Sequence, residues 1–287
     1  MSLQKKQKRK KTDTSFWDKR RGKIFSSRGG WVIGEAVHNC GYSMMDDLIG
    51  KVSFMQLLML NVTGRLPERR LADVTEAVFN CMSWPDARIW CNQIGSLAGT
   101  ARASSVAGVC AGIIANDSHM YGAGCLPQAT NFIVDALHQK KQGWSTEKIV
   151  AAQAKRPGSK PVIVGYARPM VTGDERIVAL KRVIADLGFT AGEHLALAYE
   201  IHDVFMTKYN ESMNIAAFIA AFYSDQGLST KEIYRLFSTI VMSGIHACYA
   251  EAADQPAGAF FPLRCSDIDY QGVKARNVPK HKQSNGN

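Results

Sequence analysis

The sequence predicts an all-α protein. Apolar residues recur at helical spacing over much of the chain, cap signals bound these segments, and strand-like alternation is scarce. The 287 residues suit one large domain, alone or with a smaller one attached. With 46% hydrophobic and 21% charged residues, the chain has enough apolar area to bury, so disorder over its whole length is excluded.

Cap signals place several helices after residue 41. Ser53 is predicted to cap a helix whose apolar residues continue to Val62, and Gly64 suits its left-handed C-terminal end. Pro67 is expected to open the next helix, because proline is favoured in the first helical turn. Ser229–Glu232 has the sequence of a capping box and precedes another apolar helical pattern.

Residues 98–115 are rich in alanine, glycine and serine, and Ser104, Gly108 and Gly112 recur every four residues. On a helix these positions form a flat face that another backbone can approach closely. In a soluble protein such a face indicates either a tightly packed core helix or the seam of a dimer.

Residues 156–174 contain three prolines and three glycines, which predicts a long loop that carries function. Within it, residues 161–165 read as a short strand or a buried loop. Helices are expected from Glu175 to Leu187 and from Glu193 to Tyr209, with a break at residues 188–192.

The net charge of +10 is concentrated at one end of the chain. Residues 1–23 hold ten Lys and Arg against Asp13 and Asp18, which gives +8, so the rest of the chain carries only +2. Residues 1–22 lack periodic hydrophobic residues and are predicted to be a disordered basic tail. The tail is either a solvated extension or an arm that contacts nucleic acid, whereas a basic patch over the whole body is not supported.

The seven cysteines contain no Cys-x-x-Cys pair, so no metal site is expected, and a reducing compartment fits best. The charge-free apolar stretch Ala103–Asn116 has 14 residues, fewer than the roughly 20 that cross a bilayer. No apolar run of the signal-peptide kind follows the basic N-terminus. We therefore expect a cytoplasmic protein without a membrane partner.

The order of these landmarks resembles the citrate synthase superfamily, and its short citryl-CoA lyase branch most. Three motifs carry the resemblance: Gly41-Tyr42, Ser53-Phe54, and the Leu-rich helix that runs into Thr63-Gly64-Arg65-Leu66-Pro67. The resemblance implies an all-α homodimer with a large domain of residues 23–156 plus 241–287 and a smaller inserted domain of residues 157–240. It also implies a cleft between the domains that takes a coenzyme A thioester as co-substrate, with no metal and no covalently bound cofactor.

Carried over residue by residue, the resemblance places the family's catalytic groups on altered positions. Met120 stands at the first family histidine and Arg168 at the second, while Ala216 stands at the catalytic aspartate. Cys40 and Val241 replace two further substrate arginines. Because these changes remove the family's bases and donors, production of citrate itself is not expected.

The remaining polar residues near these positions form the predicted site. The set comprises His119, Tyr121 and Arg168 as catalytic residues; Arg176, Asn214 and Tyr166 as substrate-binding residues; and Gly122, Gly165 and Arg168 as coenzyme-binding residues. Arg176 is the one matched carboxylate-binding arginine, and Asp174 is expected either to orient it or to cap the helix that follows.

Two functions stay open at this point. In the first, the protein is an enzyme that makes or breaks a carbon–carbon bond next to a thioester, acting on an acyl-CoA or related acidic substrate with a non-standard active site. In the second, it is a non-catalytic scaffold or ligand-binding dimer of the same fold. The retained Arg176 and the Gly165-Tyr166 loop favour the first, and the lost aspartate and histidines favour the second.

Overall fold

A computed structural model describes residues 13–168 and 172–278. The prediction of an all-α protein is confirmed. The α-helices are α1 (Ser15–Asp18), α2 (Phe54–Thr63), α3 (Arg69–Met82), α4 (Trp90–Thr100), α5 (Ser105–Asn116), α6 (Leu126–Lys141), α7 (Thr146–Ala151), α8 (Glu175–Asp186), α9 (Glu193–Tyr209), α10 (Ile215–Asp225), α11 (Thr230–Phe237) and α12 (Met242–Asp254). Short π and 3-10 turns lie at η1 (Met44–Leu48), η2 (Gly122–Cys125) and η3 (Cys265–Asp267).

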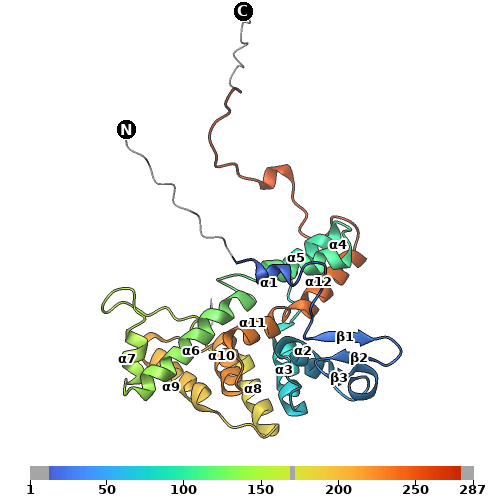
Figure 1. Ribbon diagram of the computed structural model, residues 1–287. Coiled ribbons are helices and arrows are strands. Elements are labelled where there is room, and N and C mark those ends of the chain that lie inside the picture. Colours follow the sequence, from blue (N-terminus) through green and yellow to red (C-terminus); the bar gives the residue numbers. More distant parts are fainter. Residues whose placement is uncertain (1–12, 169–171, 279–287) are drawn as a thin grey trace, which may run out of the picture.

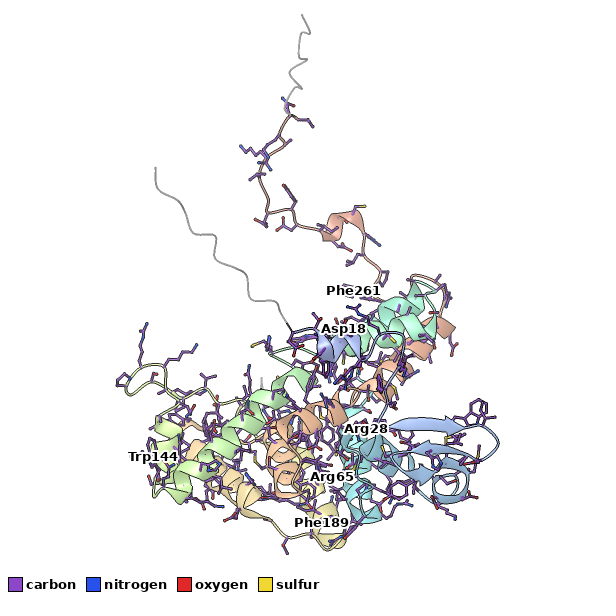
Figure 2. The ribbon with its side chains drawn as sticks, viewed as in Figure 1. Asp18, Arg28, Arg65, Trp144, Phe189 and Phe261 are labelled. Carbon is purple, nitrogen blue, oxygen red and sulfur yellow. The ribbon has the colours of Figure 1, made fainter. Side chains whose placement is uncertain are left out.

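A small antiparallel sheet near the N-terminus was not predicted. Its strands β1 (Gly29–Val32), β2 (Ala36–Asn39) and β3 (Tyr42–Ser43) are at most four residues long, too short to show a period of two in the sequence. Arg28 connects the sheet to α2, because its Nη2 donates to the Val62 carbonyl at 3.5 Å. The sheet projects beside α2 and α3 (Figures 1 and 2).

Two of the capping predictions are confirmed. Ser53 and Ser229 each accept from the N3 backbone, and the N3 side chains Gln56 and Glu232 bond back to the cap. Gly64 adopts the left-handed conformation with φ of 79°. The helix expected at Pro67 begins two residues later, with Glu68 at its N-cap.

Helices α4, α5 and α12 pack together at one end of the molecule (Figure 1). The small-residue stretch is divided between α4 and α5, and Ser104 is the N-cap of α5. A Cβ on Gly108 would lie 2.8 Å from both Ala98 and Tyr249, and one on Gly112 would lie 2.9 Å from Ile245. The small-residue face is therefore filled from within the chain, as expected for a tightly packed core helix.

Helix α10 lies in the centre of the remaining helices and contacts α6, α9 and α11. Its aromatic residues Phe218, Phe222 and Tyr223 are at most 1% exposed. Helices α8 and α9 lie where the sequence predicted them, α8 ending one residue earlier. The predicted division into domains at residues 157 and 240 stays a prediction.

Residues 161–165 form a loop rather than a strand, buried except for the exposed Val162 and the half-buried Val164. Tyr166 makes an isolated bridge to Met213. Most of the predicted basic tail, residues 1–12, lies outside the described residues. Residues 13–22 are exposed and contain α1. At the other end, residues 261–278 extend away from the helices with their side chains exposed, Phe261 among them (Figures 1 and 2).

Candidate functional site

The buried carboxylate of Asp174 is the centre of the predicted site. Its side chain is 0% exposed and caps α8 by accepting from the Arg176 backbone N–H at 3.2 Å. The same carboxylate pairs with the Arg176 guanidinium through two bonds of 2.7 Å, from Nε and Nη2. Oδ2 also accepts from the Ile215 backbone at 3.0 Å, where α10 begins. Asp174 therefore performs both of its expected roles, and it ties α8 to α10.

Arg168 lies on the same side of Asp174. Its Nη1 and Nη2 bind the Glu175 carboxylate at 2.5 and 3.1 Å, and Nη1 lies 3.8 Å from Asp174 Oδ1. The hydrogen bonds from Arg168 lower the pKa of Glu175 to about 2. Only 24% of the Arg168 side chain is exposed. To bind an external anion, Arg168 would therefore have to release the Glu175 carboxylate.

Asn214 fastens the Gly165 loop to the start of α10. Its backbone N–H donates to the Gly165 carbonyl at 2.8 Å, and its Nδ2 donates to the Ala167 carbonyl at 2.7 Å. Its Oδ1 accepts from the Ala216 N–H at 2.9 Å as the N-cap of α10. Both polar atoms of the side chain are thus used within the protein.

Tyr166 is a core residue in this structure, 2% exposed, and its predicted role in substrate binding stays a prediction. Its hydroxyl donates to the Ala198 carbonyl at 3.1 Å, and its ring stacks on Phe205 with the centroids 5.3 Å apart. Burial raises the pKa of this phenol, so it stays protonated. Tyr166 anchors the loop that carries Gly165 and Arg168.

The turn at residues 117–121 carries the other predicted catalytic groups. His119 is exposed, and its carbonyl accepts from the Cys125 thiol at 3.4 Å. The Tyr121 hydroxyl lies 3.9 Å from the Cys91 Sγ. Burial raises the pKa of Tyr121, while the positive charge of Arg176 acts in the opposite direction. Gly122, with φ of 71°, closes the turn against Asn116, where a side chain would clash.

The structure therefore brings part of the predicted set together. Arg168 and Arg176 meet around Asp174, and Asn214, which holds Gly165, precedes Ile215, whose backbone N–H binds the same carboxylate. Arg176 also reaches across to α3, where its Nη1 lies 3.1 Å from the Met82 Sδ. Within residues 13–168 and 172–278, no hydrogen bond or ion pair joins His119 or Gly122 to this cluster.

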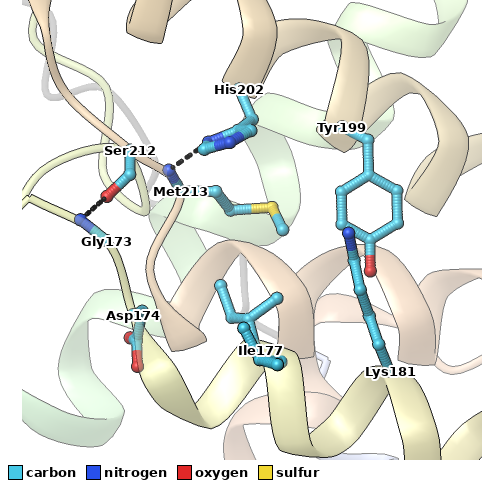
Figure 3. Close-up of a pocket in the computed structure, with 9 residues that line it drawn as sticks. Gly173, Asp174, Ile177, Lys181, Tyr199, His202, Ser212 and Met213 are labelled. Atoms are coloured by element: carbon cyan, nitrogen blue, oxygen red, sulfur yellow. Dashed lines mark hydrogen bonds between the residues drawn. The ribbon is translucent and has the colours of Figure 1, made fainter.

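Sequence reasoning missed a cavity on the other side of α8. Figure 3 shows nine lining residues, among them Lys181, Tyr199 and His202. On the amphipathic α9, Tyr199 and His202 are three residues apart and so share a face. That spacing is a weak signal, and nothing in the sequence indicates that Lys181 lies opposite them.

The described residues contain neither a metal-binding group nor a membrane-crossing helix. Over the stretches 13–168 and 172–278, no group of three or more His, Cys, Asp or Glu side chains is placed to hold a metal ion. Within those same stretches, no helix has the length and apolar character that crossing a membrane requires.

The fold defined above is that of the citrate synthase-like proteins, so the resemblance seen in the sequence is confirmed at the level of fold. Citryl-CoA lyase from Hydrogenobacter thermophilus matches with a TM-score of 0.76 and 23% identity, over 89% of this chain and 97% of that one. ATP citrate lyase from Methanothrix soehngenii matches with a TM-score of 0.71 and 17% identity, over 96% of this chain and 47% of that one. Citrate synthase from Thermoplasma acidophilum matches with a TM-score of 0.60 and 15% identity, over 79% of this chain and 59% of that one.

No protein-family model matches the sequence, and no curated protein matches it. The chain spans about half the length of the ATP citrate lyase, and nearly all of the citryl-CoA lyase.

Proposed function

We propose that this protein binds an acyl-CoA or a related acidic substrate, and that it makes or breaks a carbon–carbon bond next to the thioester. The observation that carries the proposal is the pair Arg168 and Arg176, held around the buried Asp174 in a citrate synthase-like fold. Each guanidinium group is planar and can donate two parallel hydrogen bonds to the oxygens of a carboxylate or phosphate. The neighbouring citryl-CoA lyase and ATP citrate lyase, as their names state, act on citryl-CoA and citrate.

The cleavage of a β-hydroxyacyl-CoA is the simplest such reaction. The exposed His119 would take the proton of the β-hydroxyl, and the carbon–carbon bond would then break with its electron pair moving to the thioester enolate. Tyr121, whose raised pKa keeps its phenol protonated, and Arg168 would donate hydrogen bonds to the enolate oxygen. Return of the proton to the α-carbon then gives the shorter acyl-CoA and a carbonyl product.

A second candidate is a non-catalytic scaffold or ligand-binding dimer of the same fold. Three observations favour it. Both polar atoms of Asn214 are occupied within the protein, and each arginine already has a carboxylate partner, Glu175 or Asp174. In addition, Ala216 and Met120 stand where the family has a base and a donor.

Calorimetric titration with coenzyme A and acetyl-CoA separates the two candidates. For the enzyme we expect micromolar binding that weakens about tenfold or more in Arg168→Ala, since one charge-assisted contact contributes about 1.5–3 kcal/mol. The matched control is Arg182→Ala, an exposed arginine on α8 outside the cluster. It should bind like the wild type.

Binding that follows this pattern would lead directly to a screen of β-hydroxyacyl-CoA substrates for cleavage, with His119→Ala as the inactive comparison. If the folded protein gives no heat with either ligand, acyl-CoA chemistry is excluded and the scaffold takes its place. If the affinity for coenzyme A or acetyl-CoA falls equally in Arg168→Ala and Arg182→Ala, the cluster around Asp174 is not the binding site.

We also propose that the chain forms a homodimer through the outer face of α5. Between Ser105 and Asn116 this helix has no charged residue. Its exposed residues are Ser105, Val106, Ala107, Cys110, Ala111, Ile114 and Ala115. Burial of such a face against a second copy would remove its apolar area from water.

A cytoplasmic location and a role of the basic tail in nucleic-acid contact stay predictions from the sequence.

A further inference from the structure

The cavity between α8 and α9 has the composition of a small ligand site. Its volume is about 190 Å³. A cavity of this size has room for a small organic ligand and not only for a single water molecule. Ile177 and Met213 form apolar walls, and Lys181, Tyr199 and His202 contribute the polar groups at its edge (Figure 3).

The Tyr199 hydroxyl is buried and has no hydrogen-bond partner in the protein. Burial raises the pKa of this phenol to about 12, so it is a neutral donor near pH 7. A buried polar group without a partner is destabilising, and such groups in native structures call for an explanation. An acceptor atom on a bound ligand would satisfy this one.

The positive charge beside Tyr199 indicates that the acceptor group of the ligand is negatively charged. The Lys181 ammonium lies over the Tyr199 ring, 4.0 Å from the centroid. Asp174 is the one carboxylate among the nine lining residues that the structure describes, and it is already paired with Arg176. The charge of Lys181 is therefore available to an anion in the cavity.

His202 adds a second donor. Its Nδ1 accepts the Met213 backbone N–H at 3.0 Å, so Nε2 carries the proton of the neutral ring (Figure 3). Burial lowers the pKa of His202; Lys181 lowers it further, while the exposed Asp203 raises it.

From this arrangement we propose that the cavity binds a short aliphatic carboxylate. Its carboxylate group is held by the Lys181 ammonium and the Tyr199 hydroxyl, and its hydrocarbon chain lies against Ile177 and Met213. The cavity shares Asp174 with the arginine cluster, but the proposal does not depend on acyl-CoA chemistry. Gly173 and Ser212, which line the cavity, are joined by a hydrogen bond of 2.7 Å next to Asp174, so an occupant would lie beside the loop that holds Arg168.

The test is a ligand titration of the full chain with n-butyrate, followed by NMR of the labelled methionine methyl groups. We expect saturable binding in the millimolar range, as suits a ligand of this size, with a shift of the Met213 signal. Tyr199→Phe and Lys181→Met should each weaken binding about tenfold. Loss of the unpartnered hydroxyl does not lower stability, so Tyr199→Phe reports on the ligand rather than on folding.

Lys148→Met is the matched control, because Lys148 also lies over an aromatic ring, 3.9 Å from the centroid of Trp144, but away from the cavity. It should bind butyrate like the wild type. n-Butanol, which has a similar chain and no charge, should bind at least tenfold more weakly. The proposal is overturned if butyrate does not saturate, if Lys181→Met and Tyr199→Phe leave its affinity unchanged, or if butanol binds equally well.

Discussion

Asp174 and Arg176 form a two-pronged ion pair across the first turn of α8, with both bonds at 2.7 Å. The carboxylate is fully buried, whereas the arginine side chain keeps 23% of its surface exposed. A buried carboxylate requires several partners, and here it has the guanidinium, the Arg176 N–H and the Ile215 N–H. The pair therefore fixes the position of the arginine and the junction of α8 with α10.

Replacement of the buried carboxylate, Asp174→Asn, is expected to lower the free energy of unfolding by about 3–5 kcal/mol, because it leaves Arg176 without its counter-charge. Urea unfolding followed by circular dichroism measures the change. Glu175→Gln is the control, since 68% of the Glu175 side chain is exposed and its pair with Arg168 contributes less than about 1 kcal/mol. A loss as small in Asp174→Asn as in the control would contradict a structural role for the buried pair.

Gly165 and Gly173 offer a matched comparison within the same loop. Both have positive φ, 101° and 97°, but a Cβ on Gly165 would lie 2.7 Å from the Ala217 Cβ, while one on Gly173 meets nothing within 4 Å. Gly173→Ala should cost about 1–2 kcal/mol of stability from backbone strain alone. Gly165→Ala should cost about 1–3 kcal/mol more, because α10 must also move. Equal unfolding midpoints for the two variants would show that Ala217 does not press on this loop.

His202 should give the protein an acid-sensitive stability. Burial lowers its folded-state pKa below the unfolded value of about 6.5. Below that pH the unfolded chain binds the proton more readily, so the unfolding free energy falls as the pH falls from 6.5 toward the folded-state pKa. His202→Gln should flatten this dependence in urea midpoints measured from pH 7.5 to 5, roughly the range over which histidine titrates. The exposed His138→Gln should leave it unchanged, and an identical slope in His202→Gln would refute the assignment.

A charge on the outer face of α5 should dissociate the proposed dimer. Ala111→Glu places a carboxylate in the middle of the apolar face, where burial against a second copy would desolvate it. We expect sedimentation velocity to show a shift from dimer to monomer, with the helical circular dichroism unchanged. Ala196→Glu, on an exposed position of α9, should leave the mass as it is. A wild type that already sediments as a monomer would rule out this interface.

Local sequence signals identified the helices well, because caps and apolar periodicity act within a few residues. The N-cap at Ser53, the capping box at Ser229 and the exact bounds of α9 follow from them. The three-stranded sheet escaped notice, since its register depends on the pairing of β1 with β2 rather than on a pattern within either strand. The break at residues 101–104 escaped for a related reason, because alanine and serine permit both helix and turn.

For the candidate site, too, some features follow from local sequence motifs and others only from the tertiary structure. The sequence by itself determined the fold class, the position of the Gly165 loop and the matched Arg176, because these depend on local motifs. Only the tertiary structure decided that Tyr166 is a core residue, that Asn214 is occupied by the loop it fastens, and that Arg168 and Arg176 meet around one carboxylate. It also brought Lys181 of α8 next to Tyr199 of α9. Burial and the direction of each side chain depend on contacts between helices that are distant in the sequence, and no window of neighbouring residues contains that information.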